Sequence, residues 1–438
     1  MSKIMFVTQP TMGHTNAILS IAVRLKELGH EVLFVIPNAK RIPKKIINRL
    51  PDYVKTSLSI PGKVRANGIN CVSIDMPIKV LFKYMILPFA KRFTETQYAM
   101  NVFSDCLYKY SKLIEGIVLR EKPDVIVNDF FFFPPYIVAE RYDIPCVTIY
   151  HSGLPFRGDG IPPFGSGLAI NGNWGVKGKL YAILSRNTNK LVTKRYIRAC
   201  KKMDVSDIRK VNWSKPYSKW LNLLLTAKEI EAPRQLNNNN TIFVGPCFSC
   251  KRIDIQDKFP FEILSEEIPK IYVSLGTVFN NKPKVFKKIL SGLEKENYQV
   301  IVSAGGAYNK LIKYNFNNNI LIFKRVPQLE ILKKVDIVIS HGGNNTINET
   351  LAAGKPIIVM PIGGEQGDNA SKIQYLNVGK RINISNFSSN EVLEKVKSIF
   401  ADSIYKQNAE RIRKIISKTD GVSTSVKLIS SVAENRKI

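Results

Sequence analysis

The side chains with the most evident chemistry lie in one stretch of the second half of the chain, residues 340–370, which reads SHGGNNTINETLAAGKPIIVMPIGGEQGDNA. Short apolar runs at 336–340 and 357–361 predict two buried strands, and the spacing over 344–353 predicts a helix. A histidine and two glycines stand between the first strand and the helix. The first N–H groups of a helix lack partners and lie at the positive end of its dipole, and glycine lets a phosphate approach the backbone. The stretch therefore predicts a diphosphate site.

Polar side chains surround this predicted anion site. Three of them are hydrogen-bond donors at the helix start: His341, Asn345 and Thr346. Glu349 follows Asn345 by four residues, so it lies on the same helix face and can reach a diol such as a ribose. Glu365 and Gln366 follow the second strand, where they can bind several sugar hydroxyls. The stretch thus predicts ribose and hexose sites beside the diphosphate site.

The first half of the chain carries polar groups at the ends of two other predicted strands. His14 follows an apolar strand at 3–8, and Asp129 ends another at 123–129. Open α/β sheets bind ligands at the carboxyl ends of their strands, so both residues are candidates for a functional site. The alternatives are structural: a core or capping histidine, and an aspartate that caps the next helix.

Three residues near these strand ends are candidates for contact with a bound acceptor: Phe130, Phe131 and His151. The two phenylalanines suit an apolar ligand, and they fit a protein core equally well. His151 follows the strand predicted at 145–150. The glycine- and proline-rich loop from there to residue 178 suits a mobile rim of an acceptor site.

Length, composition and charge limit the class of protein. The chain has 438 residues, 45% of them hydrophobic, which is enough for two or three domains with packed cores. Because the sequence shows neither a run of about 18 apolar residues nor a signal peptide, we expect a cytoplasmic protein. The formal charge of +30 attracts anions such as nucleotides or an anionic membrane face. No nucleic-acid motif accompanies this charge, so we expect no nucleic-acid partner.

Strand and helix signals alternate along both halves of the chain, which predicts an α/β fold of doubly wound parallel sheets. Residues 227–240, which include a proline and end in the four asparagines at 237–240, look like a linker. We therefore expect a first domain over 1–228 and a second over 229–420. The segment 421–438 is predicted to form a C-terminal helix.

The second domain resembles the donor-binding signature of the nucleotide-sugar glycosyltransferases, in particular the macrolide-type branch of the family that includes the plant secondary-metabolite enzymes. That signature runs His-x-Gly-x-Asn-[Ser/Thr], then Glu, Pro and [Asp/Glu]-Gln. It is matched here by His341, Gly343, Asn345, Thr346, Glu349, Pro361, Glu365 and Gln366. The resemblance implies the GT-B fold, in which two Rossmann-like domains face each other across a cleft and the C-terminal helix returns to the first domain.

The resemblance also implies roles for single residues. His14, which stands in a Gly-His pair at the family's position, would be the general base. Asp129 would fix its tautomer and stabilise its protonated form. Thr277 would donate to a phosphate oxygen, and Gln328 would contact the edge of a uracil. Arg325 stands where the family usually has tryptophan, so a guanidinium would stack on the base, and this departure leaves the identity of the base open.

We expect from this resemblance an inverting enzyme that moves a hexose, such as glucose or N-acetylglucosamine, from a UDP-sugar to a hydroxyl group of a small apolar natural product. The UDP-sugar is a co-substrate, and neither a cofactor nor a metal is expected, because the chain has no Asp-x-Asp triplet and the family is metal-independent. Four alternatives remain: a dTDP-sugar donor, a lipid acceptor at the inner membrane face, an isomerase, and a non-catalytic protein of the same fold.

Overall fold

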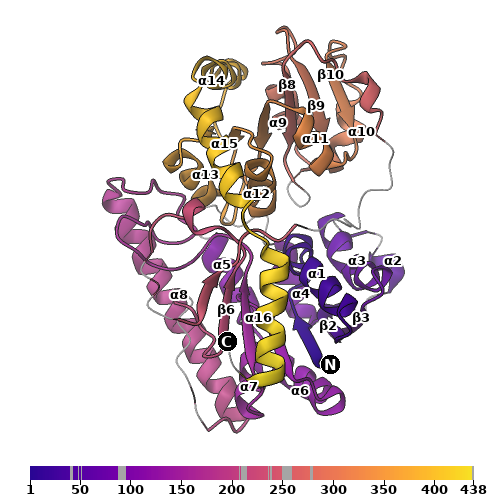
Figure 1. Cartoon of the computed structure of the whole chain (residues 1–438), viewed down its shortest axis with the longest axis vertical. Coiled ribbons are helices and arrows are strands. Elements are labelled where there is room, and N and C mark those ends of the chain that lie inside the picture. The colour runs from indigo at the N-terminus through magenta and orange to yellow at the C-terminus, as the bar shows by residue number, and fades with distance from the viewer. Residues whose placement is uncertain are drawn as a thin grey trace. The chain divides into compact units, whose positions relative to one another are not determined.

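The chain folds into two compact units. Unit 1 consists of Met1–Ser166, Asn173–Ile253 and Thr419–Ile438, and unit 2 consists of Gly167–Gly172 and Asp254–Lys418. The computed structural model describes residues 1–39, 43–47, 49–50, 52–86, 95–206, 208, 215–234, 236, 239–248, 259–276 and 280–436. Each unit is built around its own sheet, and helices pack on that sheet (Figure 1).

Unit 1 contains a seven-stranded sheet in the order β3-β2-β1-β4-β5-β6-β7, in which all neighbouring strands are parallel. Its strands are β1 (Lys3–Val7), β2 (Glu31–Asn38), β3 (Asn70–Asp75), β4 (Val125–Asp129), β5 (Cys146–Tyr150), β6 (Leu221–Leu224) and β7 (Thr241–Phe243). Its helices are α1 (Met12–Glu27), α2 (Lys44–Ile47), α3 (Asp52–Ala66), α4 (Ile78–Ile86), α5 (Glu95–Phe103), α6 (Leu107–Glu121), α7 (Pro134–Arg141), α8 (Gly175–Lys202) and α16 (Gly421–Asn435), with a 3-10 turn η2 (Lys228–Ile230). The strand order reverses between β1 and β4, the point at which such sheets bind ligands.

Both faces of the first sheet are covered, which explains why its strands β4, β5 and β6 are buried along their whole length. Met5 and Val7 of β1 belong to a core that contains residues of α6, α7 and α8. Ile4 and Phe6 point to the other face and join a core with residues of α1, α3 and α16. The alternation along one strand thus fixes a helical layer on each side of the sheet.

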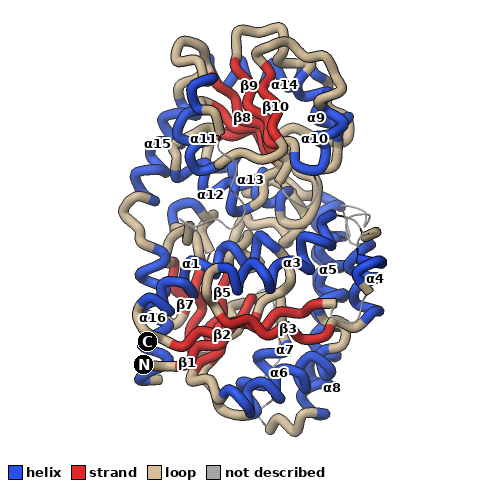
Figure 2. Tube along the Cα trace, turned by 90° about the vertical axis from the view of Figure 1, so that its right-hand side faces the viewer, coloured by secondary structure: helices blue, strands red, loops and turns tan. Residues whose placement is uncertain are grey.

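Unit 2 contains a six-stranded parallel sheet in the order β10-β9-β8-β11-β12-β13, whose strands are red in Figure 2. Its strands are β8 (Lys270–Ser274), β9 (Gln299–Ser303), β10 (Ile320–Phe323), β11 (Ile337–Ser340), β12 (Ile357–Val359) and β13 (Gly379–Arg381). Its helices are α9 (Pro283–Leu290), α10 (Tyr308–Leu311), α11 (Gln328–Lys334), α12 (Asn344–Ala352), α13 (Gln366–Tyr375), α14 (Ser389–Ala401) and α15 (Ile404–Ile416), with 3-10 turns η3 (Phe261–Ile263) and η4 (Gly305–Ala307). Here the order reverses between β8 and β11.

The division of the chain differs from the expected boundaries at two places, after residue 228 and over 167–172, whereas the C-terminal helix lies in the unit to which the resemblance assigned it. Strand β7 pairs with β6 and extends the first sheet, so unit 1 continues beyond residue 228 to Ile253. Helix α16 packs on α1 and belongs to unit 1, as Figure 1 shows in yellow beside indigo. Residues 167–172, from the loop expected to line an acceptor site, belong to unit 2.

In the described parts of the chain, no helix has the length and apolar character needed to cross a membrane.

Candidate functional site

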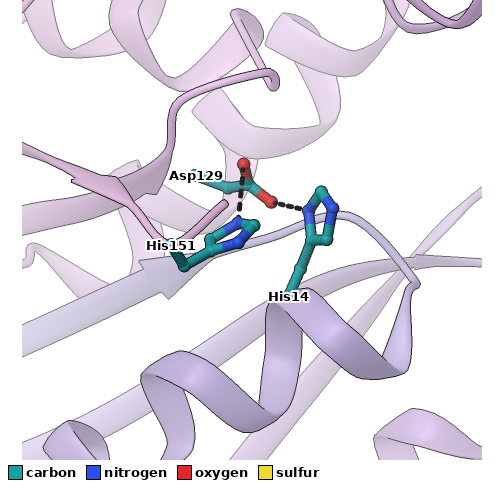
Figure 3. Close-up of side chains that lie close together, drawn as sticks. All are labelled: His14, Asp129 and His151. Atoms are coloured by element: carbon teal, nitrogen blue, oxygen red, sulfur yellow. Dashed lines mark hydrogen bonds and ion pairs between the residues drawn. The ribbon is translucent and has the colours of Figure 1, made fainter. Parts of the chain in front are cut away.

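The reversal of strand order in unit 1 brings His14 and Asp129 together. His14 lies in the first turn of α1, which follows β1, and Asp129 is the last residue of β4, the neighbouring parallel strand. His14 Nδ1 lies 2.6 Å from Asp129 Oδ2 (Figure 3). The His14 side chain is 23% exposed, whereas that of Asp129 is fully enclosed. The pair therefore consists of a buried carboxylate and an imidazole that still reaches solvent.

Both oxygens of the Asp129 carboxylate have partners. Thr8, the residue after β1, lies with its hydroxyl 3.3 Å from Oδ2, and the Phe131 backbone N–H donates to Oδ1 at 3.2 Å. Burial raises the pKa of Asp129, but the attraction of His14 and His151 outweighs it, so the pKa lies below its ordinary value. Asp129 is therefore ionised at neutral pH. Thr8 was not predicted, although it too stands at a strand end.

His151 lies beside His14 and faces the other oxygen of the same carboxylate. It follows β5, is 3% exposed, and its Nε2 lies 3.4 Å from Asp129 Oδ1. Its ring centroid is 4.1 Å from that of His14. Burial and the nearby His14 lower the pKa of His151, and the attraction of Asp129 does not offset them. The sequence suggested contact with an acceptor, whereas the structure directs this side chain towards Asp129.

The two phenylalanines after Asp129 differ in exposure. Phe130 is 4% exposed and packs in a small core with Tyr150 and its neighbours, so it is a core residue. Phe131 is only partly buried; its ring centroid lies 3.9 Å from that of Phe130 and 6.0 Å from that of Phe164. Phe131, whose backbone N–H contacts Asp129, therefore keeps part of its aromatic surface exposed.

The cluster also has to be considered as a metal site. One ligand atom from each of His14, Asp129 and His151 lies within 4.8 Å of the others. The 2.6 Å separation between His14 Nδ1 and Asp129 Oδ2 is that of a charge-assisted hydrogen bond, in which a proton is held between the two atoms. This geometry suits proton transfer, and we assign no metal to the cluster.

In unit 2, the reversal between β8 and β11 places His341 between two glycines. An added Cβ would lie 2.4 Å from His341 Cε1 at Gly276, and 2.6 Å from its Nε2 at Gly343. Gly276 has φ +77°, a conformation that other residues rarely adopt. Burial lowers the pKa of His341 to about 4, and its Nδ1 lies 3.2 Å from the Ser340 hydroxyl. The ring is therefore a neutral hydrogen-bonding group at the start of α12.

The residues expected to bind a nucleobase and a ribose are in direct contact. Gln328, the first residue of α11, donates through Nε2 to Glu349 Oε2 at 2.6 Å and lies 3.5 Å from the Thr346 hydroxyl. The Tyr272 hydroxyl donates to Gln328 Oε1 at 3.0 Å. Glu349 is 5% exposed. Sequence analysis did not identify Tyr272, which points from β8 to this cluster.

Gln366 and Glu365 occupy different positions. Gln366 is 5% exposed, and its Oε1 accepts from the backbone N–H groups of Ile362 and Gly363 at 2.8 and 3.0 Å. It therefore shapes the loop after β12, whereas Glu365 is partly exposed. Asn369, which was not predicted, joins this loop to the other glycine turn by donating to the Gly342 carbonyl at 2.9 Å.

The remaining expected donor residues are placed as follows. Asn345 is partly exposed at the second position of α12. Thr346 is buried next to it. Arg325 is exposed after β10. Thr277 lies outside the described residues.

Residues 167–172 form a short strap on unit 2. The Gly167 N–H donates to Asp368 Oδ1 at 2.7 Å, and Arg381 Nη1 donates to the Gly167 carbonyl at 2.6 Å. The Ile170 N–H donates to the Ser371 hydroxyl at 3.0 Å. Asp368 and Ser371 belong to α13, so the strap lies beside the loop that carries Glu365.

Comparison with known proteins agrees with this arrangement. A family model described as UDP-glucoronosyl and UDP-glucosyl transferase matches residues 177–420. The NDP-glycosyltransferase YjiC of Bacillus subtilis (strain 168) is 21% identical over 422 residues, which cover 95% of this chain and 94% of that protein. The demethyllactenocin mycarosyltransferase of Streptomyces fradiae is 22% identical over 439 residues, covering 99% of this chain and 87% of that protein. The solved structure of the glycotransferase of kitacinnamycin has a TM-score of 0.74 and 17% identity, over 98% of both chains. The predicted GT-B fold is thereby confirmed.

Proposed function

Because the chain belongs to the UDP-glucoronosyl and UDP-glucosyl transferase family, we propose that it moves a hexose from a UDP-sugar to a hydroxyl group of a small apolar natural product, with inversion at the anomeric carbon. The chain is a glycosyltransferase, an enzyme that takes its sugar from a nucleotide sugar. The observation that carries the finer proposal is the 2.6 Å contact between His14 Nδ1 and Asp129 Oδ2.

In the proposed reaction His14 is the general base. Asp129 keeps the proton of the neutral imidazole on Nδ1, which leaves the lone pair of Nε2 for the proton of the acceptor hydroxyl. As that proton moves to Nε2, the hydroxyl oxygen attacks the anomeric carbon, and the nucleoside diphosphate leaves with the electron pair of the broken bond. The buried carboxylate stabilises the imidazolium. Attack opposite the leaving group inverts the carbon.

The donor would bind to unit 2 around the start of α12. The first N–H groups of that helix, with Asn345, Thr346 and the neutral His341, are donors suited to the charge that grows on the diphosphate as the sugar leaves. Gln328 and Glu349 hold each other at 2.6 Å, and in this proposal the pair would contact the base and the ribose. Glu365, partly exposed, would contact hexose hydroxyls. In this proposal no metal bridges the diphosphate.

The acceptor class is supported by the names of relatives and by one side chain. The similar Streptomyces fradiae protein is a mycarosyltransferase for demethyllactenocin, and the kitacinnamycin enzyme bears the name of another natural product. Beside the base, the partly buried ring of Phe131 offers an apolar surface to such an acceptor.

The nucleobase of the donor would be bound by Arg325. This exposed side chain would stack on the base, where either uracil or thymine fits.

The proposal can be tested by nucleotide binding followed by turnover. UDP, dTDP and UDP-sugars should raise the melting temperature to different extents, and EDTA should leave the shift unchanged. A selective shift by dTDP would replace the proposed donor by a dTDP-sugar. Mass spectrometry of an acceptor library with the stabilising donor should then show a product one hexose heavier. Consumption of donor without acceptor would favour an isomerase, and binding without any turnover would favour a non-catalytic protein.

A second candidate, a lipid acceptor at an anionic membrane surface, is favoured by helix α8. The outward side of this helix exposes Val176, Leu180 and Ile183, which are 81%, 45% and 50% exposed. The same helix holds nine lysines and arginines and no acidic residue. Apolar side chains flanked by basic ones are typical of helices that lie on anionic membranes.

Vesicle sedimentation would separate the two candidates. If α8 binds a membrane, the protein should sediment with phosphatidylglycerol vesicles, and less so in high salt or with phosphatidylcholine alone. The double variant Leu180→Glu, Ile183→Glu should lose this binding. Ile312→Glu, at a 52% exposed position of unit 2, is the matched control. Equal binding by both variants would exclude α8 as the contact, and no sedimentation would leave the soluble acceptor.

A further inference from the structure

His151 is a buried histidine beside the base for which the proposed reaction has no role. Its Nε2 lies 3.4 Å from Asp129 Oδ1, and its ring is tilted 53° to that of His14 at a centroid distance of 4.1 Å (Figure 3). With 3% of the residue exposed, it has almost no surface to offer an acceptor. Its position at the end of β5 follows from the pairing of β5 with β4, whose last residue is Asp129.

We propose that His151 is a positioning residue, which fixes the Asp129 carboxylate through Oδ1, the oxygen that His14 does not contact, and so keeps the base in its working tautomer and orientation. The inference rests on the proposed function, in which His14 takes the acceptor's proton. His151 itself exchanges no proton with the substrate.

The division of contacts on the carboxylate supports this role. Oδ2 faces His14 and Thr8, at 2.6 and 3.3 Å. Oδ1 faces the Phe131 N–H and His151 Nε2, at 3.2 and 3.4 Å. These partners come from different segments of the chain, so together they resist rotation of the carboxylate. A rotation that moved Oδ2 would also move the proton on His14 Nδ1, and misplacement of a reacting group by about 1 Å is enough to slow catalysis about 100-fold.

The charges around His151 also support its proposed role as a positioning residue. Among the described residues, the titratable groups that act on it are His14 and Asp129. Burial and His14 lower the pKa of His151, so its ring is neutral at neutral pH. In this proposal Nε2, the nitrogen that faces the carboxylate, carries the proton of the neutral ring. A neutral donor holds Asp129 without placing a second positive charge beside the imidazolium that forms on His14. A lysine or arginine at this position would oppose that imidazolium.

The test compares His151→Phe with His151→Gln. Phenylalanine keeps the ring that packs edge-on against Phe130 and removes the donor, whereas the glutamine amide reaches about as far as Nε2 and keeps it. His30→Phe is the matched control, because His30 is held by Ser2 and Ser430 just before β2, at the opposite ends of the strands. Turnover and donor KM are measured across pH, with UDP affinity by calorimetry for each variant.

We expect His151→Phe to lower kcat by about 10- to 100-fold at unchanged donor KM and UDP affinity. The acid limb of its pH profile should move to higher pH, because a carboxylate that loses a donor holds the proton of the base more tightly. His151→Gln should recover much of kcat, and His30→Phe should behave as the wild type.

Three results would overturn the inference: wild-type kcat and acid limb in His151→Phe, equal loss in the Phe and Gln variants, or the same loss in His30→Phe. If the Phe variant does not fold, a Gln variant with a wild-type profile supports the donor role, and one with a large loss refutes it. Failure of the proposed function itself looks different, because it would appear as undiminished transfer by His14→Ala.

Discussion

Replacement of Asp129 by asparagine should block the base while it leaves the shape of the site intact. The amide can present either its oxygen or its NH2 group to His14. The Phe131 N–H, 3.2 Å from Oδ1, and His151 on the same side both require an acceptor at that position. The amide oxygen therefore takes the place of Oδ1, and the NH2 group faces His14 Nδ1, with the Thr8 hydroxyl able to accept its second proton.

The size of the effect follows from this orientation. With an NH2 group against Nδ1, the imidazole proton moves to Nε2, the atom that has to receive the acceptor's proton. The wrong tautomer lowers the turnover of a histidine base by about 10⁴-fold in a comparable triad, which corresponds to about 5.4 kcal/mol at 1.36 kcal/mol per factor of ten. If the amide oxygen faced His14 instead, only the charge would be lost, at about 1 kcal/mol. The structure thus predicts the larger loss, about 10³- to 10⁴-fold.

The assay is kcat/KM for transfer, with UDP affinity measured by calorimetry as the control, since the proposed donor-binding residues belong to unit 2. The double variant His14→Ala, Asp129→Asn should lose no more than His14→Ala alone, because the two residues act as one unit. A loss of less than tenfold in Asp129→Asn would refute the orientation argument. Additive losses in the double variant would refute the coupling of the pair.

The remaining predictions concern the donor site and acid stability. Glu349→Ala should weaken UDP binding by about 1.5–3 kcal/mol, because it removes a buried carboxylate that also holds Gln328 Nε2 at 2.6 Å. Calorimetry should show a smaller loss of UDP affinity for Glu349→Gln. Equal losses in the two variants would contradict a role for the charge of Glu349. Gly276→Ala should also weaken UDP binding, since its Cβ would lie 2.4 Å from His341 Cε1. Gly29→Ala, at φ +89° with open space around it, is the control for backbone strain alone. Unchanged binding in Gly276→Ala would contradict the idea that Gly276 and Gly343 hold the His341 ring in place for the donor. The pKa of Asp129 is lower in the folded protein than in the unfolded chain, so its contribution to stability is present above the unfolded pKa of about 3.9 and is lost as the pH falls. The melting temperature of Asp129→Asn should therefore fall less than that of the wild type below about pH 4, whereas parallel falls would contradict this linkage.

The sequence was sufficient for those parts of the fold that follow from local patterns. Buried parallel strands are short apolar runs, so β1, β4, β8 and β11 could be located, and with them the strand ends that carry the candidate site residues. Strand β7 has three residues, and what makes it part of the first sheet is its pairing with β6, a contact that no local pattern encodes. The expected boundary at 228 was early for that reason.

The candidate site could be located residue by residue, but its contacts could not. His14 and Asp129 were identified because each stands at a strand end. The same rule identified His151 and yet assigned it to an acceptor, because sequence does not show which neighbouring strand end a side chain faces. The link between Gln328 and Glu349 depends on the packing of α11 against α12, which their separation in the chain does not reveal.

The two histidines at the strand-order reversals show how neighbours determine the use of one residue type. His14 lies 2.6 Å from an ionised carboxylate that stabilises a positive charge on its ring, so it is suited to take a proton. His341 lies between two glycines, and burial alone lowers its pKa to about 4. A ring that stays neutral donates a hydrogen bond to a diphosphate without a proton of its own to lose. In the proposed function, the same residue type thus serves as a base where a carboxylate lies beside it, at His14, and as a neutral donor where glycines enclose it, at His341.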